Sequence, residues 1–555
     1  MYKYKISDKL FKMVLLERKK MCFGEKQRDF LTYKDDEKGQ LRTFFKVWGV
    51  LNIVYAYMVF NFFWGNHDWD FLKDGVKLSS GFFEGRFSQH IFSYFLFDGH
   101  ILPVITYFLS FAALVGLAFA VGRYLEIPQK MWGGLALFIG LNPHMFVLFY
   151  YFYLLLPFIC WAGLGVLALF LAEPKFGVVK FLGGAVFCVL LLGSYPPNLN
   201  FILTVFLARR LLMIWLHKQT VKEGFFCGCF FLGQLVAGYL GYKVVFSVLL
   251  KWGYLNSEWY NLQVRSVSEM LGAVPVELWR SLEQLFHFYH FMDWAYCVPL
   301  AAGCFAAIGL FIKNAENKII AGVGIVVIFL ASRFAFLVSA SSYVAVFRCE
   351  YWGRLGLYVF AFSILSHFKQ REIKNFLFAL GIIVLWIFVK TDFEIEKVRY
   401  SGFRAERLYH TRLVERVVQH KSFDAQKKYL SLAFGGSDFC LKYYDSNYVV
   451  KEGEFLGKLT LPFQLIEVLF FEENQNPVDI QAGVWASQLY TKGPKSEKYR
   501  KQPLNVQNMR YWMYNEAKVF PKEDFIYADD KFLLLNLDEL LFARYREVVL
   551  KGIDY

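Results

Sequence analysis

Residues 101–122 read ILPVITYFLSFAALVGLAFAVG and contain no charged side chain. This length matches the ~20 apolar residues that an α-helix needs to cross a bilayer. Ten more runs are similarly apolar, the tenth span at 355–368 being shorter than the rest, so the sequence predicts a polytopic α-helical membrane protein with about 11 transmembrane helices. These runs lie at 45–64, 131–149, 152–172, 178–194, 199–216, 225–250, 295–312, 319–338, 355–368 and 373–390.

The composition of the whole chain agrees with a membrane location. Of its 555 residues, 56% are hydrophobic, 20% are aromatic and only 19% are charged. A soluble globular enzyme and a disordered chain are both disfavoured by this balance. The many aromatic residues, above all 62 Phe and 34 Tyr, suit a lipid or headgroup environment.

The net charge of +14 is distributed in a way that predicts topology. If the N-terminus is cytoplasmic, the cytoplasmic segments hold 25 Lys and Arg and the opposite loops hold 8. Positive residues favour the cytoplasmic side, so we expect an N-in chain. The excess charge lies in these short segments and not on a soluble face, and nucleic acid is therefore not an expected partner.

The predicted spans divide the chain into three parts. Residues 1–43 form a basic cytoplasmic segment without the pattern of a cleaved signal peptide, so the first span is expected to be an uncleaved anchor. Residues 44–390 form the membrane domain. Residues 391–555 carry 24 basic and 24 acidic side chains and are expected to form a mixed α/β domain on the far side. Its predicted elements are helices at Phe403–His420 and Leu533–Val549 and strands at Tyr429–Phe434 and Phe455–Leu461.

The first far-side loop, 65–100, carries the candidate catalytic residues. His67, Asp68 and Asp70 crowd an imidazole and two carboxylates beside a membrane exit. Glycosyl transfer needs a base for the proton of the attacking hydroxyl, and Asp68 is well placed to meet a lipid-borne donor near the headgroups. The alternative is that both aspartates are solvated loop residues.

Arg86 follows this loop and precedes a predicted surface helix, Phe87–Phe97. Its guanidinium suits a phosphate group, and the alternative is a headgroup anchor. Four further cations are candidates for holding the phosphate of a lipid. Lys243 and Arg333 lie within predicted spans, where polar groups are costly, and Arg348 and Arg354 precede the tenth span. The alternative for the last two is surface pairing with Glu350.

Two other far-side segments are of interest. The turn Ser194–Asn200 contains Tyr195 and two prolines, and it either lines a sugar site or is a rigid connector. The long loop 251–294 is expected to contain a second amphipathic helix on the membrane surface. His144 is expected to be a hydrogen-bonded interior residue.

No metal site is predicted. The nine cysteines show no zinc spacing, and the pair His287 and His290 lacks an evident third ligand. Whether the chain uses a divalent cation is left open, and no other cofactor is indicated.

At these residues the chain resembles the bacterial serotype-converting glucosyltransferases, the O-antigen glucosylating enzymes of the glucosyltransferase domain II type. The resemblance covers residues 44–390 and rests on the order of four short motifs. Where that family has two adjacent acids, this chain has an acid at Asp68 and a second at Asp70, so either aspartate is the candidate base. The motifs are His67-Asp68-Trp69, Gly85-Arg86, Ser194-Tyr195 and Arg348.

The resemblance implies a membrane glycosyltransferase of the GT-C class in the bacterial inner membrane. It implies a polyprenyl-phosphate glucose donor, a glycan acceptor such as the O-antigen of lipopolysaccharide, and transfer on the periplasmic side. A flippase or transporter of lipid-linked sugars is the alternative, since it explains the intramembrane cations without a base. A structural subunit that acts through residues 391–555 is a third possibility.

Overall fold

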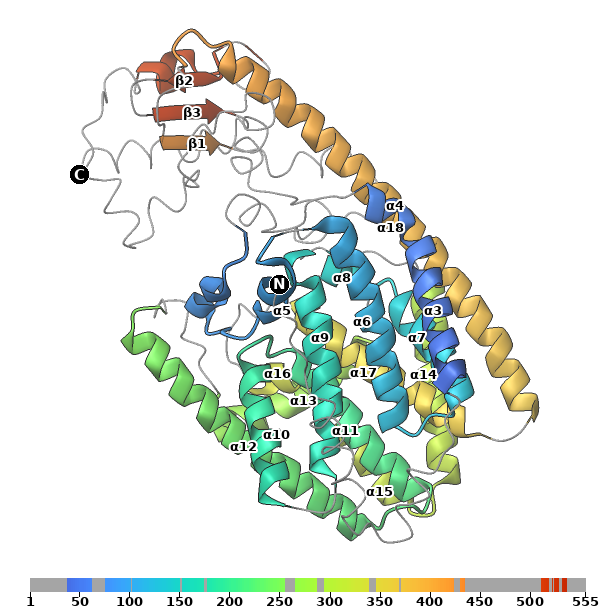
Figure 1. Ribbon diagram of the computed structural model, residues 1–555. Coiled ribbons are helices and arrows are strands. Elements are labelled where there is room, and N and C mark those ends of the chain that lie inside the picture. Colours follow the sequence, from blue (N-terminus) through green and yellow to red (C-terminus); the bar gives the residue numbers. More distant parts are fainter. Residues whose placement is uncertain are drawn as a thin grey trace, which may run out of the picture. The chain divides into compact units, whose positions relative to one another are not determined.

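The computed structural model is described here for the parts of the chain whose placement it defines. These are residues 37–61, 75–100, 102–149, 152–173, 177–254, 265–286, 294–338, 346–368, 371–423, 430–434, 511–518, 522, 524–528 and 532–536. The chain divides into two units, residues 1–46 and 47–555. In the first unit the described residues form the start of helix α3 (Glu37–Val54), and all other elements belong to the second unit (Figure 1).

Four described helices are long and apolar enough to cross a membrane. They support the prediction of a helical membrane protein, whereas eleven crossings and a GT-C arrangement remain predictions. Helices α10, α15 and the apolar part of α14 are shorter. The four are α6 (Pro103–Tyr124), α9 (Phe152–Ala168) extended by η4 (Leu169–Ala172), α11 (Asn198–Trp215) and α12 (Val221–Lys251).

The helices pack in neighbouring pairs. The most extensive contacts join α6 to α9, α10 to α12 and α11 to α17, and α11 also packs on α15 (Figure 1). Each pair joins elements that the sequence separates by one or more other helices, which creates a common interior. The remaining elements of this body are α10 (Val178–Leu192), α13 (Val267–Glu283), α14 (Trp294–Asn314), α15 (Lys318–Ala331) and α17 (Val346–His367).

Two of the predicted spans are broken helices. The span 131–149 consists of η3 (Gln129–Met131), α7 (Trp132–Gly140) and α8 (Met145–Phe149), and the span 319–338 consists of α15 and α16 (Phe334–Val338). Pro143 explains the first break, because proline has no amide hydrogen and disfavours helical geometry in the residue before it. At the second break, the hydroxyl of Ser332 donates to the carbonyl of Phe329, 2.7 Å away.

The first predicted span is interrupted as well. Helix α3 ends at Val54, Tyr55 adopts a turn, and α4 (Ala56–Phe60) follows. Tyr55 is fully buried, and its ring packs on Phe111 and Phe149 with centroids 5.3 and 5.2 Å away. The turn thus directs a tyrosine hydroxyl into the interior of the bundle.

Side-chain hydrogen bonds cap the starts of α12 and α13. Thr220 accepts from the amide of Glu223 at the start of α12, and Ser266 does the same with Glu269 at the start of α13. In both, the glutamate reaches back to the amide of the capping residue, which completes a capping box. The bonds from Ser266 also lower the pKa of the exposed Glu269 carboxyl.

Helix α17 approaches the second break very closely at Gly353. A Cβ built on Gly353 would lie 1.8 Å from the carbonyl oxygen of Ser332, a backbone atom that cannot rotate away. Only glycine therefore fits at this crossing of α17 with the α15–α16 junction.

Gly353→Ala is expected to lower the free energy of unfolding by about 1–3 kcal/mol, because the new methyl group forces the two backbones apart. Gly381→Ala is the matched control, since a Cβ at Gly381 meets no atom within 4 Å. The control is expected to be neutral or slightly stabilising because alanine has the higher helix propensity. Thermal unfolding of the purified variants measures both, and equal stability of the two would contradict the steric argument.

The segment after the first loop differs from the predicted surface helix. Residues Phe87–His90 form a turn, and only Ile91–Phe97 are helical, as α5. Ser88, Gln89 and His90 are buried, with at most 3% of their surface exposed. These polar residues are therefore buried against the protein and do not lie on the membrane surface: Ser88 bonds to backbone groups of the bundle, and Gln89 contacts the side chains of Arg86 and His90.

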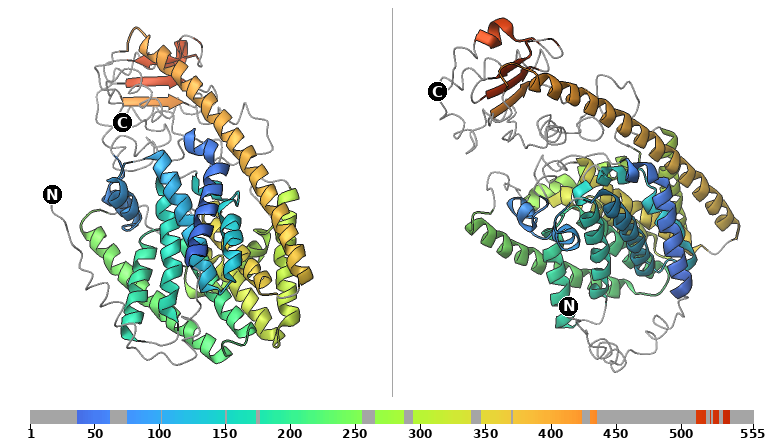
Figure 2. Two further views of the ribbon diagram at one scale, coloured as in Figure 1. Left: turned by 45° about the vertical axis from the view of Figure 1, so that its right-hand side comes forward. Right: turned by 45° about the horizontal axis from the view of Figure 1, so that its top comes forward.

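Helix α18 (Arg371–Val418) is one unbroken helix of 48 residues (Figure 2). It contains the last predicted span, the expected domain boundary at Lys390 and most of the predicted helix Phe403–His420, which is confirmed as far as Val418. The boundary therefore falls within a helix. No proline or glycine lies between Lys390 and Tyr400 to stop it.

The described part of the C-terminal region includes a three-stranded sheet of order β1-β3-β2. Strand β1 (Leu430–Phe434) confirms the predicted strand there and pairs in parallel with β3 (Phe532–Asn536), which pairs antiparallel with β2 (Ile526–Ala528). The predicted helix Leu533–Val549 is wrong at its start, because β3 hydrogen-bonds on both sides. The short π-helix η6 (Trp512–Glu516) precedes β2, and the predicted strand Phe455–Leu461 lies outside the described residues.

Candidate functional site

The candidate bases Asp68 and Asp70 and the candidate substrate-binding residue His67 lie outside the described residues, but both flanks of their loop are described. Before the loop, α4 ends at Phe60, and the amide of its capping residue Asn61 donates to the carbonyl of Tyr57. After it, the amide of Val76 donates to the carbonyl of Gly99 at 2.7 Å, which closes the segment 75–100 on itself. The loop therefore starts and ends at fixed points of the second unit.

Glycines shape the segment that follows. Gly99 has φ of +77°, and a Cβ there would lie 2.2 Å from the carbonyl oxygen of Val76. A Cβ at Gly81, in the 3₁₀ helix η2 (Leu78–Glu84), would lie 2.4 Å from the carbonyl oxygen of Arg86. Both positions need glycine, so that the chain can fold tightly and present Arg86 at its end.

Ser88 fastens this segment to the helices. Its amide donates to Gly193 at 2.8 Å and its hydroxyl to the carbonyl of Leu190 at 2.6 Å. The indole of Trp161 on α9 donates to the carbonyl of Ser88 at 3.0 Å. All three contacts involve buried groups or backbone, and they hold the neighbouring Arg86 in a fixed position.

Arg86 lies against an aromatic pair. Its guanidinium carbon is 5.7 Å from the ring centroid of Tyr195, and the ring of Tyr195 stacks on Phe158 at 3.9 Å. The guanidinium also donates to the side-chain oxygen of Gln89 at 3.4 Å. Arg86 is half-buried, so a cation is held on a tyrosine face at the edge of the bundle. We call Arg86, Gln89, His90 and Tyr195 the Arg86 site.

His90 is neutral in this site. The side-chain amide of Gln89 lies 3.0 Å from Nε2 of His90. Burial, and after it the positive charge of Arg86, lowers the pKa of His90 to about 3. Arg86 therefore supplies the positive charge of the Arg86 site at physiological pH, and that charge does not titrate.

The turn Ser194–Asn200 is a rigid connector apart from Tyr195. Asn198 donates to the carbonyl of Phe158 at 3.3 Å, and the side-chain oxygen of Asn200 accepts from the amide of Ala335 at 2.8 Å. Both asparagines are fully buried. Their amides hold α9 and the α15–α16 junction in place, so the connector interpretation is correct for them and only Tyr195 reaches the Arg86 site.

Arg333 occupies the second helix break and is paired with two carboxylates. Its Nε donates to Glu277 at 2.6 Å and its Nη1 to Glu350 at 2.7 Å. Arg333 is fully buried, and Glu277 and Glu350 are at most 7% exposed. The predicted phosphate role does not fit this environment, because both carboxylates already neutralise the guanidinium and exclude an anion.

Arg354 and His144 continue this network. Arg354 lies 3.7 Å from the second oxygen of Glu350 and hydrogen-bonds to Nε2 of His144. The side-chain oxygen of Asn142 accepts from both the amide and Nδ1 of His144, at 3.1 and 2.8 Å. Nδ1 must therefore carry the imidazole proton, which leaves Nε2 as the acceptor for Arg354. The predicted interior role of His144 is confirmed.

The predicted phosphate ligands whose side chains the structure describes have different partners. Arg333 and Arg354 share Glu350 in the buried network, whereas Arg86 lies with Tyr195. Lys243 is exposed on α12 and rests over the rings of Phe246 and Tyr239, at 5.3 and 5.6 Å. For Arg348 the structure describes the backbone within α17 but not the side chain.

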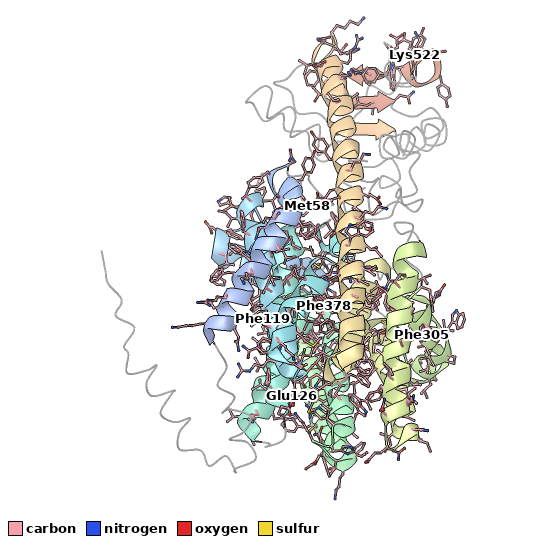
Figure 3. The ribbon with its side chains drawn as sticks, turned by 90° about the vertical axis from the view of Figure 1, so that its right-hand side faces the viewer. Met58, Phe119, Glu126, Phe305, Phe378 and Lys522 are labelled. Atoms are coloured by element: carbon pink, nitrogen blue, oxygen red, sulfur yellow. The ribbon has the colours of Figure 1, made fainter. Side chains whose placement is uncertain are left out.

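A second charged cluster lies at the opposite end of α11. Arg209 and Arg210 both pair with Glu173, and Arg209 also lies 3.3 Å from Glu126. Figure 3 shows Glu126 and Met58 at opposite ends of this helical body. The cluster ties together the ends of α6, α9 and α11, and its cations are neutralised by carboxylates.

Sequence reasoning missed Glu277 and the pair Tyr55 and Asp392. Glu277 was assigned to a surface helix, but α13 packs on α15 and α16 and buries it. Asp392 belongs to the predicted far-side domain, yet its carboxyl lies 3.0 Å from the Tyr55 hydroxyl inside the second unit. One signal in the sequence could have indicated Asp392. It follows an apolar run directly and stands four residues before a second acid, Glu396.

Within the residues that the structure describes, no group of three or more His, Cys, Asp or Glu side chains could hold a metal ion. Comparison with protein-family models, curated proteins and solved structures finds no match to this chain.

Proposed function

We propose that the chain is a membrane-embedded hexosyltransferase that uses a polyprenyl-phosphate donor, with glucose as the expected sugar and a glycan such as an O-antigen as the acceptor. The observation that carries the proposal is the Arg86 site. Directly after a loop with two aspartates, a cation is fixed on a tyrosine face at the edge of a body of apolar helices. Transfer of a sugar from a lipid phosphate needs a base and a phosphate-binding cation at the same depth in the membrane.

In the proposed reaction, Asp68 or Asp70 removes the proton from an acceptor hydroxyl. The oxygen then attacks the anomeric carbon of the donor, and the bond between that carbon and the phosphate oxygen breaks. Polyprenyl phosphate leaves with the bonding electron pair, and Arg86 stabilises its negative charge. Charge stabilisation of this kind is usually the larger catalytic term. Tyr195 and its partner Phe158 position the guanidinium.

Of the predicted phosphate ligands, the proposal assigns the phosphate to Arg86. Arg86 is preferred because it is half-buried at the edge of the bundle, whereas Arg333 is paired to Glu277 and Glu350 in the interior. Arg333 and Arg354 then act as structural charges that hold the broken helices together. On this proposal the reaction takes place on the periplasmic side of the bacterial inner membrane.

The second candidate is a transporter of lipid-linked sugars, and one observation favours it. Breaks in two helices place His144 and Arg333 in a buried polar network, and broken helices beside buried charges are typical of substrate sites in transporters. The two candidates differ in whether a glycosidic bond is made.

Purified protein in lipid nanodiscs, incubated with synthetic polyprenyl-phosphate glucose and candidate glycan acceptors, tests the proposal. The expected result is release of polyprenyl phosphate that depends on both the protein and the acceptor. Donor binding, or donor movement across proteoliposomes, without any release would instead establish the transporter. Loss of all function only when residues 391–555 are removed, with the loop acids freely replaceable, would favour the structural subunit.

A further inference from the structure

The hydroxyl of Tyr55 has two acceptor neighbours and one proton. It lies 3.0 Å from the carbonyl oxygen of Gly140, the last residue of α7, and 3.0 Å from Oδ2 of Asp392 on α18. All three groups are in the interior, and both Tyr55 and Asp392 have 0% of their surface exposed. Water therefore cannot replace either hydrogen bond.

The proton count of this contact constrains Asp392. A carbonyl oxygen only accepts, and an ionised carboxylate also only accepts. With one hydroxyl proton, Tyr55 can satisfy Gly140 or an ionised Asp392, but not both. Both contacts are hydrogen bonds only if Asp392 is protonated, so that it donates to the Tyr55 oxygen while Tyr55 donates to Gly140.

The surroundings favour the same state. Among the described residues no cation pairs with Asp392, and its Oδ1 has no hydrogen-bond partner. The titratable groups that face it are Glu396, on the same helix, and Tyr55, while Tyr351 of α17 lies near Tyr55. Aromatic rings pack around Tyr55 from α6 and α8. A buried carboxylate without a cation is costly, whereas a carboxylic acid with a hydrogen bond is not.

We propose that Asp392 is a proton-binding site that holds its proton at neutral pH, and that the chain Asp392 to Tyr55 to Gly140 fastens α18 to the first helices of the second unit. Ionisation of Asp392 would cost this chain one hydrogen bond and place a negative charge beside Glu396. The site thus makes the attachment of α18 depend on protonation, independently of the proposed transferase reaction.

The pKa of the Asp392 carboxyl is shifted in the direction that a protonated acid requires. Asp392 lies beyond the last predicted span. Burial raises the pKa of its carboxyl well above the usual value, the contact with Tyr55 opposes this rise, and the charge of Glu396 adds to it. Since the folded chain then holds a proton that the unfolded chain releases, stability is greatest at low pH and falls as the pH rises towards the folded pKa.

Infrared spectroscopy of the full-length protein in nanodiscs tests the site directly. The expected result at neutral pH is a carbonyl stretch of a buried carboxylic acid that Asp392→Asn removes. Glu394→Gln is the matched control on the same helix, because Glu394 is partly exposed and pairs with Lys390 at 3.6 Å; it should leave the band in place. Identical spectra for the wild type and Asp392→Asn would overturn the proposal.

The variants also give a stability readout. Asparagine can donate to the Tyr55 oxygen as a protonated acid does, so Asp392→Asn is expected to fold. It should match the wild type in thermal stability at low pH and exceed it at neutral pH, because only in the wild type does ionisation of residue 392 stabilise the unfolded chain. Failure of Asp392→Asn to fold would contradict a neutral Asp392. Tyr55→Phe removes the acceptor for the Asp392 proton and should shift the infrared band to higher frequency; an unmoved band would place the proton elsewhere.

Discussion

Asp68→Asn is expected to lower turnover by about 10²- to 10⁴-fold, the contribution of a positioned general base. Asparagine keeps the shape of the side chain but cannot accept the proton of the acceptor hydroxyl. Donor affinity should change little, because Arg86 and Tyr195 contact the phosphate end of the donor in the proposed reaction. Release of polyprenyl phosphate measures turnover, and binding of the donor to the same nanodiscs measures affinity.

Asp70→Asn separates the two candidate acids, since the acid that is not the base should tolerate this change. Asp98→Asn is the control from the same far-side segment. Asp98 is exposed with φ of +51°, a conformation that asparagine also tolerates, so full activity is expected. Full activity in both Asp68→Asn and Asp70→Asn would remove the proposed mechanism.

Arg333→Met is expected to have the largest effect on stability. It leaves Glu277 and Glu350 buried without their cation, and breaking a buried ion pair in this way costs about 3–5 kcal/mol. The free energy of unfolding, or the midpoint of thermal inactivation where unfolding is irreversible, measures the loss.

Two further variants distinguish charge from packing at Arg333. Arg280→Gln removes the other partner of Glu277, but the Arg280 side chain is 53% exposed, so a change of about 1 kcal/mol or less is expected. Replacing Arg333 with Met and both Glu277 and Glu350 with Gln should recover part of the stability, because neither carboxylate is then left without Arg333; the loss of Glu350 beside the buried Arg354 limits the recovery. A stable Arg333→Met variant would contradict the role assigned to the buried pairs.

Hydropathy predicted several helices to within a few residues. The run 101–122 corresponds to α6 at Pro103–Tyr124, and 199–216 corresponds to α11 at Asn198–Trp215. The breaks at Tyr55 and Arg333 could not be predicted in this way, because an apolar run has the same hydropathy whether its helix is continuous or interrupted. Only Pro143 marked a break in the sequence itself.

The partners of the buried charges could not be predicted for a different reason. Arg333 meets Glu277 and Tyr55 meets Asp392 only after distant helices have packed, and no local spacing encodes such pairs. The pair Glu350 and Arg354 was visible because four residues separate the two positions on one helix. The sequence therefore identified which charged side chains lie within or beside apolar helices. It did not identify which of these charges form ion pairs with one another.

A rod of 48 residues without a hinge has mechanical consequences. At the helical rise, α18 measures about 72 Å, more than twice the ~30 Å of a hydrocarbon core. Asp392 contacts Tyr55 from near the middle of α18, and Val418 is the last residue of this helix. Val418 lies 26 residues after Asp392, about 39 Å along the helix axis, so a small tilt of α18 at the contact with Tyr55 displaces Val418 more than the residues next to Asp392.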